Sequence, residues 1–321
     1  MNKTVPYLFA ILLLCGLIGL PAMARERYIV SGASGELGER VVRELLQRGV
    51  APQDLILVSH RVERLTEFEK LGAIVREGDV TRPETLVPAY AGGTQMVLIS
   101  VGLNMKEPRP VLHKRAIDAA VRAGVKHIVY TSFTGANTGS SPVAMDHRLT
   151  EEALRASGDQ WTILRLGEYA DRWVLGAAQN MVQSGRAVQP PDERFSAPIL
   201  YADCAAAVVG AMLNPAAVNQ VYEVTGPEKV TQTDIARVTG EVTGRKIEVI
   251  AGKPGEGRAI PMAPPPGAPF LPPPPGGAEP DLPQFTSAQL AENAARFKQL
   301  TGRSPAGLRQ MIEAYKAQLM K

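Results

Sequence analysis

Three glycines near the N-terminus have the types and spacing of a phosphate-binding loop. Gly32, Gly35 and Gly38 follow a short apolar segment and precede an amphipathic helical pattern. Glycine suits such a turn because the strand must bend sharply into the helix and the backbone must approach a pyrophosphate closely. Backbone N–H groups and the positive end of the helix then face the phosphates. An ordinary glycine-rich turn between a strand and a helix is the alternative. The predicted cofactor-binding loop consists of Gly32, Ser34, Gly35, Glu36, Leu37 and Gly38.

The segments that must position this loop alternate between apolar runs and amphipathic patterns as far as residue 166. Apolar runs of this kind are typical of strands that are covered on both faces. The succession predicts an α/β fold with a Rossmann-like, doubly wound parallel sheet and right-handed crossovers. The expected strands are 28–31, 55–59, 74–76, 96–101, 127–132 and 161–166. The expected helices are 37–48, 62–71, 83–90, 110–123 and 143–157.

Beyond residue 168 the pattern is less regular, and the sequence predicts five parts. They are a signal peptide (1–24), an NAD(P)-binding Rossmann core (25–168), a smaller substrate-side lobe (169–251), a proline-rich loop or linker (252–283) and C-terminal helices (284–321). The expected lobe strands are 197–200, 221–224 and 247–250, and the expected helices are 203–213, 231–242, 287–300 and 305–319. Proline runs favour extended polyproline II, so we expect a surface spacer at 252–283. A lid over the cleft and a partner-docking segment are the alternatives.

The first 24 residues have the layout of a secretory signal peptide. Lys3 precedes an apolar run over residues 5–20, and Ala22-Met23-Ala24 is a small-residue cleavage site. We therefore expect cleavage after Ala24 and an exported, periplasmic protein. The alternative is an uncleaved segment that anchors the protein in the membrane. Lipid attachment at Cys15 is not expected, because leucine precedes this cysteine.

Charge and cysteine usage narrow the class of partner. The formal net charge of +3 favours neither a nucleic acid nor an anionic membrane surface. After cleavage Cys204 is the one remaining cysteine, and its apolar surroundings predict a packed side chain rather than a nucleophile. The four histidines lack metal-ligand spacing, so we expect no metal. A small-molecule partner is expected, and the oligomeric state is not predicted.

Ligands of a doubly wound sheet bind outside the carboxyl ends of the strands. At the end of the second strand, Arg61 can pair with a 2′-phosphate, and Ser59 and His60 can add hydrogen bonds. No carboxylate is present there to bind the ribose hydroxyls of NADH, so we expect NADP, as NADPH, in preference to NAD. The alternative is that Arg61 only begins a solvated helix. The other strand-end residues expected to contact the cofactor are Asp79, Ser100, Val101, Gly102, Thr131 and Phe133.

Several ordered motifs resemble the NmrA-like branch of the atypical short-chain dehydrogenase/reductases. The likeness is greatest to bacterial NAD(P)H:quinone oxidoreductases and covers roughly residues 26–250. It implies a Rossmann fold, an NAD(P) cofactor and an Asp79 that lies beside the adenine; a cap of the next helix is the alternative for Asp79. The motifs are Gly32-Ala-Ser-Gly35-Glu-Leu-Gly38, Gly78-Asp79, Val129-Tyr-Thr-Ser132, Leu164-Arg-Leu-Gly167, Tyr201-Ala-Asp203 and Val221-Tyr-Glu-Val-Thr-Gly226.

The chain departs from ordinary short-chain dehydrogenases where a Tyr-x-x-x-Lys pair would protonate the substrate. His147-Arg-Leu-Thr-Glu151 stands at that position. Loss of a positioned acid costs about 10² to 10⁴ in rate for a demanding carbonyl, whereas a quinone depends less on it. His147 is a candidate proton donor, with a helix-surface histidine as the alternative. Ser132 is the second candidate for the catalytic position, and a plain strand-to-loop role is its alternative.

The acceptor is expected to lie against side chains that follow the fifth and sixth strands. The expected contacts are Phe133, Glu168, Tyr169 and Trp173, although the last two have the spacing of core aromatics. The leading interpretation is an NAD(P)H-dependent oxidoreductase that transfers hydride to a quinone-like or conjugated acceptor. The alternative is a non-catalytic NAD(P)-binding regulator or scaffold of the NmrA-like type. A sugar-nucleotide or isoprenoid-type reductase or isomerase is disfavoured by the missing Tyr-Lys pair.

Overall fold

The structure is a computed structural model that describes residues 26–191, 193–253 and 283–321. The expected signal peptide and nearly all of the proline-rich segment lie outside the described residues.

The central sheet has seven parallel strands in the order β3-β2-β1-β4-β5-β6-β8. The chain runs outward from β1 to β3, returns to β4 and continues toward β8, which places a crossover point between β1 and β4. This confirms the predicted Rossmann-like fold. The strands are β1 (Tyr28–Ser31), β2 (Leu55–Ser59), β3 (Ile74–Glu77), β4 (Gln95–Leu98), β5 (His127–Phe133), β6 (Gln160–Leu166) and β8 (Gln220–Val224).

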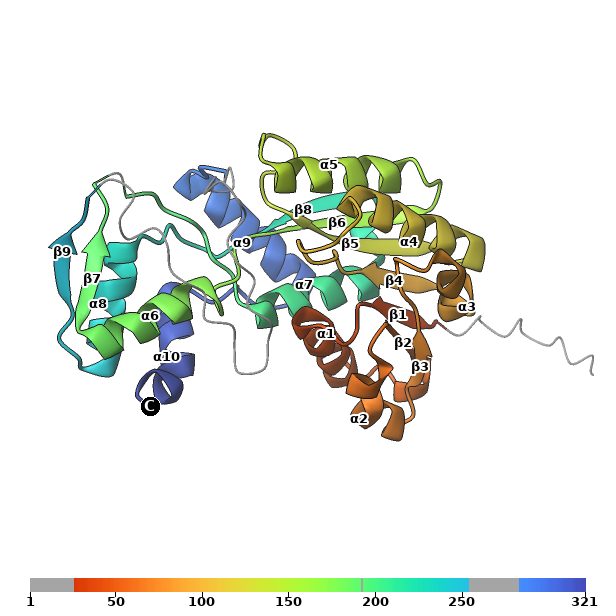
Figure 1. Cartoon of the computed structure of the whole chain (residues 1–321), viewed down its shortest axis with the longest axis horizontal. Helices are drawn as coiled ribbons and strands as arrows, with labels where there is room; N and C mark the ends of the chain where they lie inside the picture. Colours follow the sequence, from red (N-terminus) through yellow and green to blue (C-terminus); the bar gives the residue numbers. More distant parts are fainter. Residues whose placement is uncertain (1–25, 192, 254–282) are drawn as a thin grey trace, which may run out of the picture.

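Helices cover both faces of this sheet (Figure 1), and alternate residues of each strand point to opposite faces. Ile29 and Met96 belong to the core beneath α3, α4 and α5, whereas Val30 and Val97 belong to the core beneath α1 and α7. The helices around the sheet are α1 (Glu36–Gln47), α2 (Thr66–Lys70), α3 (Leu86–Tyr90), α4 (Arg109–Ala123), α5 (Pro142–Arg155), α7 (Tyr201–Leu213) and α9 (Ser287–Thr301). Short 3₁₀ helices occupy Pro52–Asp54, Val62–Leu65, Pro83–Thr85 and Pro215–Ala217.

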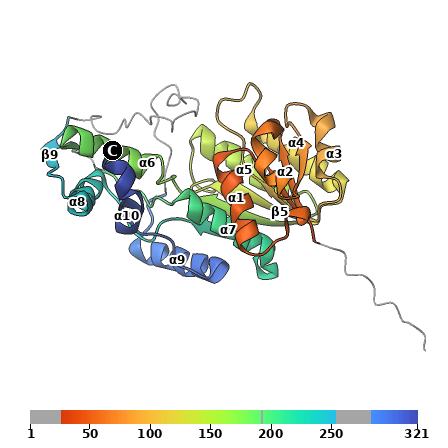
Figure 2. The same ribbon diagram turned by 90° about the horizontal axis from the view of Figure 1, so that it is seen from below.

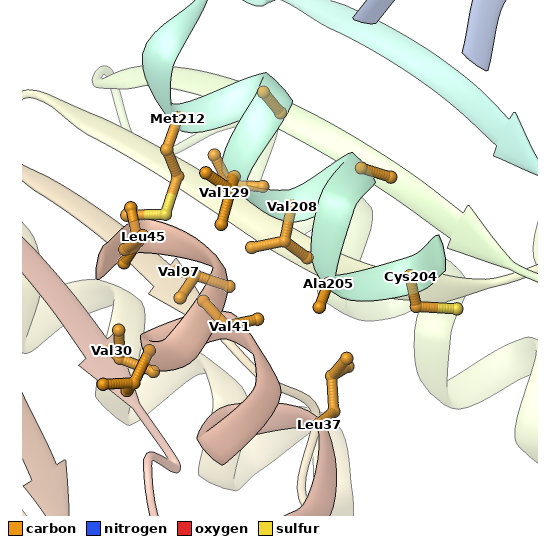
Figure 3. Close-up of a cluster of buried hydrophobic side chains, with 14 of the residues drawn as sticks. Val30, Leu37, Val41, Leu45, Val97, Val129, Cys204, Ala205, Val208 and Met212 are labelled. Atoms are coloured by element: carbon orange, nitrogen blue, oxygen red, sulfur yellow. The ribbon is translucent and has the colours of Figure 1, made fainter. Parts of the chain in front are cut away.

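The packing of α1 against α7 explains why the later sequence is needed to complete the core. Figure 2 shows α7 between α1 and α9. In Figure 3, Val41 and Leu45 of α1 face Val208 and Met212 of α7 above the strands. Cys204 is fully buried in the same cluster, which confirms its expected packing.

A second, smaller part of the molecule lies beyond the ends of β6 and β8 (Figure 1). It has its own apolar core and a two-stranded parallel sheet. Its elements are α6 (Trp173–Ser184), β7 (Arg186–Gln189), α8 (Gln232–Thr243), β9 (Glu248–Ala251) and α10 (Leu308–Leu319).

Three differences from the sequence-based expectation concern the smaller part and its boundary with the main sheet. The range assigned to the lobe contains α7 and β8, which belong to the main sheet, so residue 168 does not separate the two parts. Residues 197–200 do not form a strand: within this range only Ile199 forms an isolated bridge, with Tyr169, and Pro198 has no N–H to donate to a ladder. Helix α6 and strand β7 were not expected from the sequence pattern.

Candidate active site

The glycine loop joins β1 to α1 in a tight turn. Gly32 has a φ of 92°, in the left-handed region that glycine favours. The N–H groups of Gly32 and Ala33 both donate to the carbonyl of Val58, at 3.0 and 3.1 Å. A Cβ added to Gly38 would lie 2.2 Å from the carbonyl oxygen of Gly32. Any side chain at position 38 would therefore push α1 away from the loop.

The first turn of α1 presents free backbone donors. Gly35 is the N-cap, and no side chain caps the helix. Within the part of the chain that the structure describes, the N–H groups of Glu36, Leu37 and Gly38 have no acceptor. These donors and the positive helix end form a cradle that fits a pyrophosphate. The loop therefore fits the phosphates of a dinucleotide, as the sequence predicts.

The end of β2 holds two exposed basic groups on a fixed turn. The Ser59 hydroxyl is buried, lies 2.6 Å from the Ser34 hydroxyl and accepts a hydrogen bond from the Arg61 N–H at 2.9 Å. Ser59 thus shapes the turn, whereas His60 and Arg61 are exposed. Arg61 makes no ion pair among the described residues, so its guanidinium is available to an anionic ligand. Arg64, one 3₁₀ turn further on, is a second exposed cation that sequence reasoning did not single out.

Asp79 follows β3 and stabilises a turn rather than a helix. Its carboxylate accepts hydrogen bonds from the N–H and the hydroxyl of Thr81, at 2.9 and 2.7 Å. Burial would raise the pKa of Asp79, but the bonds from Thr81 outweigh it and hold the pKa below its usual value. The carboxylate is therefore charged at the edge where the adenine is expected.

The loop after β4 is shaped by side chains from the neighbouring strand and helix. The N–H of Ser100 donates to the Thr131 hydroxyl at 2.9 Å. The N–H of Val101 donates to Nε2 of His113 at 2.9 Å, and the Val101 carbonyl accepts from Nε of Arg109 at 3.0 Å. These contacts draw the chain out of the sheet after Leu98, whereas the sequence predicted a strand to residue 101. Their effect is to fix the expected cofactor-binding residues Ser100, Val101 and Gly102.

Arg109 and His113 were missed by sequence reasoning, although both are buried. Their spacing of four residues places them on one face of α4, and that pattern was the available signal.

Hydrogen-bond chemistry fixes the protonation state of His147. Nε2 of this residue lies 3.1 Å from the guanidinium of Arg109, and Nδ1 lies 2.8 Å from the hydroxyl of Tyr130. Because a guanidinium can only donate, Nε2 is the acceptor and the ring proton must reside on Nδ1. The imidazole is therefore neutral, with both nitrogens engaged inside the protein.

This geometry corrects the helix-surface alternative for His147 and bears on its predicted role as a proton donor. The residue is only 4% exposed, so it is not a helix-surface histidine. Burial, followed by the nearby charge of Arg109, lowers the pKa of His147 well below its usual value. A neutral imidazole whose two nitrogens are both hydrogen-bonded inside the protein is poorly suited to donate a proton, and the catalytic role of His147 stays a prediction.

Ser132 is also committed to an internal partner. Its hydroxyl donates to Oε1 of Glu151 at 2.6 Å. Glu151 also receives two hydrogen bonds from Arg165, at 2.9 and 2.8 Å. Burial would raise the pKa of Glu151, but the bonds from Arg165 and Ser132 outweigh it and lower the pKa. The position of the family lysine therefore holds a carboxylate that is neutralised by Arg165.

The expected acceptor contacts divide into two groups. Phe133 ends β5, with its ring 6.0 Å from that of His147, and Glu168 follows β6 at the same edge. Tyr169 instead stacks on Tyr201 at 4.1 Å. Trp173 packs against the core of the smaller part. The geometry thus leaves Phe133 and Glu168 as the better candidates for acceptor contacts.

Three features together define a dinucleotide-binding protein. They are a glycine loop at the crossover point of a parallel sheet, free N–H groups at the start of the following helix, and an exposed arginine after the second strand. Residues 32–215 match the model of the NAD(P)H-binding family, and the chain belongs to that family.

The chain is similar to proteins of bacteria that are named as reductases. The NAD(P)H azoreductase of Xenophilus azovorans is 32% identical over 226 residues, which are 70% of this chain and 76% of the relative. Quinone oxidoreductase 2 of Escherichia coli is 29% identical over 219 residues, which are 68% of this chain and 75% of the relative. The structure of the NADPH-dependent quinone oxidoreductase of Escherichia coli in complex with NADPH has a TM-score of 0.72 and 23% identity, covering 92% of this chain and 100% of that chain. The expected resemblance is confirmed, and the chain is an NAD(P)H-dependent oxidoreductase.

Among residues 26–191, 193–253 and 283–321, no cluster of histidine, cysteine, aspartate and glutamate could hold a metal ion. In these same ranges, no helix is both long and apolar enough to span a bilayer.

Proposed function

We propose that this protein reduces a quinone-like or conjugated acceptor with NADPH. The observation that carries the proposal is the state of the two side chains at the catalytic position. The protons of Ser132 and His147 are held by Glu151 and Tyr130, so neither side chain offers a proton to a substrate. An acceptor whose reduced oxygens are delocalised anions suits such a site, because it can take its proton from water after the hydride has arrived.

The protein's contribution is to bind, orient and shield. Bound NADPH would supply the hydride, which carries two electrons to the acceptor. The cradle at α1 would hold the phosphates, and the fixed loop at Ser100 and Val101 would shape the nicotinamide side of the cleft. Phe133 offers a ring face against which a planar acceptor can pack. Such positioning alone accounts for a large rate gain.

Three features support NADPH over NADH. Arg61 is exposed and unpaired within the described residues, Arg64 adds a second positive charge, and the strand end Ser59-His60-Arg61 contains no carboxylate, although the exposed Glu63 lies between the two arginines in the chain. A relative of the same fold was solved with NADPH.

The test is NADPH consumption by the purified protein with a panel of naphthoquinones and azo dyes. With each naphthoquinone, we expect one equivalent of hydroquinone for each NADPH oxidised. Tight NADPH binding without reduction of any acceptor would contradict the proposal and favour the non-catalytic regulator.

We further propose that the protein is exported, with a mature chain that starts at Arg25. Lys3, the apolar run and the Ala22-Met23-Ala24 site support this. N-terminal sequencing of protein from a periplasmic fraction should find Arg25 first. A full-length chain confined to the cytoplasmic fraction would contradict export.

A further inference from the structure

A small hollow with a volume of about 10 Å³, room for one water-sized group, lies at the carboxyl ends of β6 and β8, beside the expected acceptor contact Glu168. Its wall combines polar side chains with an aromatic ring that enters from the segment before α9. The lining includes Thr134, Gly167, Glu168, Ser196, Thr225 and Phe285.

The backbone on one side of the hollow is rigidly held. The N–H of Gly226 donates to the carbonyl of Ala197 at 3.1 Å, and the N–H of Ser196 donates to the carbonyl of Val230 at 3.0 Å. A Cβ added to Gly226 would lie 2.3 Å from the carbonyl oxygen of Pro198. The absence of a side chain at position 226 thus lets this segment lie across the strand ends, with Ser196 at the wall of the hollow.

Ser196 carries a buried hydroxyl without a partner. The residue is 8% exposed, and its Oγ has no hydrogen-bond partner. A buried, unpaired hydroxyl lowers stability, and alanine would avoid that penalty. The hydroxyl is therefore poised to bond a group that is not part of this chain.

The position of the hollow points to the acceptor rather than to the cofactor. In the strand order, β1 carries the glycine loop, β4 and β5 follow, and β6 and β8 come next. Neighbouring strands lie about 4.8 Å apart. A planar acceptor over Phe133 at the end of β5 would reach the hollow with a substituent on its far ring.

We propose that the hollow binds a neutral oxygen substituent on the far ring of an aromatic acceptor. Ser196 is the hydrogen-bond partner of that oxygen, and the Phe285 ring is an apolar wall beside it. A serine hydroxyl can donate to a carbonyl oxygen and can accept from a hydroxyl. This inference rests on the proposed function and specifies the class of acceptor: a fused or linked aromatic with an oxygen distant from the reacting ring.

Two naphthoquinones that differ in one group test the subsite. 6-Hydroxymethyl-1,4-naphthoquinone and 6-ethyl-1,4-naphthoquinone have nearly the same shape, but only the first carries a hydroxyl. Their dissociation constants are measured with the full protein saturated with NADP⁺, so that no turnover occurs. Ser196→Ala should weaken the hydroxymethyl compound about five- to tenfold, the value of one hydrogen bond, and leave the ethyl compound unchanged. Equal constants for the variant and the unmodified protein would overturn the proposal.

Matched variants separate binding from structure. Ser157→Ala removes a hydroxyl that donates to the carbonyl of Leu154 after α5, and it should change neither constant. Phe285→Ala should weaken both compounds by the same factor, because the ring contacts carbon rather than oxygen. The melting temperature of Ser196→Ala should be unchanged or higher. A fall of several degrees would show a structural role for the hydroxyl and would overturn the proposal.

Turnover of the two quinones distinguishes this proposal from the proposed function. If the unmodified protein reduces both compounds but binds them independently of Ser196, the subsite is wrong and the reductase function stands. If neither compound is reduced while binding depends on Ser196, the subsite stands and the reductase function is wrong.

Discussion

The glycine loop and the end of β5 lie at the same edge of the sheet, but they are built in opposite ways. The loop leaves its backbone donors free, and Gly38 leaves no room for a side chain. At the end of β5, Ser132 and Tyr130 are bonded to buried side chains of α5. The first region is prepared to receive a ligand, whereas the second satisfies its own polar groups. The difference supports the proposal that the protein binds and orients the cofactor while water supplies the proton.

Of the changes proposed to test this comparison, Gly38→Ala should have the largest effect, which is on the affinity for NADPH. Because the new Cβ would meet backbone at 2.2 Å, the loop must shift, and we expect NADPH binding to weaken by about a hundredfold or more. Gly240→Ala is the matched change in α8 of the smaller part, where a Cβ would lie 3.2 Å from the carbonyl oxygen of Arg245. Fluorescence titration of both variants with NADPH measures the difference. Similar affinities would show that the loop does not bind the cofactor.

Arg61→Ala should weaken NADPH binding about ten- to a hundredfold, the value of a charge-assisted contact with the 2′-phosphate. NADH lacks this phosphate, so its dissociation constant should change little. Arg122→Ala, in the last turn of α4, is the charge-matched control. Equal losses of affinity for NADPH and NADH would show that Arg61 does not bind the 2′-phosphate.

His147→Ala should lower the free energy of unfolding substantially but lower the rate of quinone reduction only slightly. The change leaves the Arg109 guanidinium and the Tyr130 hydroxyl without their buried partner, which costs about 3 kcal/mol of unfolding free energy. Quinone reduction by the folded fraction should fall less than about tenfold, since loss of a catalytic acid would cost about 10² to 10⁴. Urea unfolding and turnover are measured on the same preparation. A stable variant with a rate lowered more than a hundredfold would restore His147 as the acid.

Acid should destabilise the protein through its buried histidines. Burial lowers the pKa of His113 to about 3 and that of His127 to about 4, and it lowers the pKa of His147 well below its usual value. Below about pH 6.5 the unfolded chain binds protons that the folded chain rejects, so stability falls as the pH drops from about 6.5 toward about 4. Each histidine should cost about 2 kcal/mol between pH 6.5 and pH 5.

His127→Gln provides the control for this acid effect, because it removes one titrating group outside the cleft. Its unfolding free energy should fall less steeply with pH than that of the unmodified protein. An unfolding midpoint that does not change between pH 7 and pH 5 would contradict the neutral state of these histidines.

The sequence predicted the sheet because its strands are uninterrupted apolar runs and its first turn is rich in glycine. It did not predict that α7 and β8 return to the main sheet, since local periodicity carries no information about which element a later strand will pair with. The prediction of a strand at residues 197–200 was wrong. The proline at position 198, which has no N–H to donate, was a signal against a strand in the sequence itself.

The sequence predicted the parts of the candidate site that depend on backbone geometry, such as the glycine loop. It predicted less well the parts that depend on which side chains hydrogen-bond to one another. His147 was left open as a surface residue, although its spacing from Ala144, Glu151 and Leu154 places it on the buried stripe of α5. Its bond to Arg109 could not be read from sequence, because α4 and α5 meet only in the folded sheet.

The central claim is that the end of β5 orients the reactants without supplying a proton. It is tested most directly by the rate of hydride transfer when NADPH-loaded protein is mixed rapidly with 1,4-naphthoquinone at pH 6 to 8. Because His147 is neutral throughout this range, the rate should be independent of pH. A rate that falls as the pH rises through about 6.5, with the dependence abolished in His147→Ala, would contradict the account and identify His147 as a general acid.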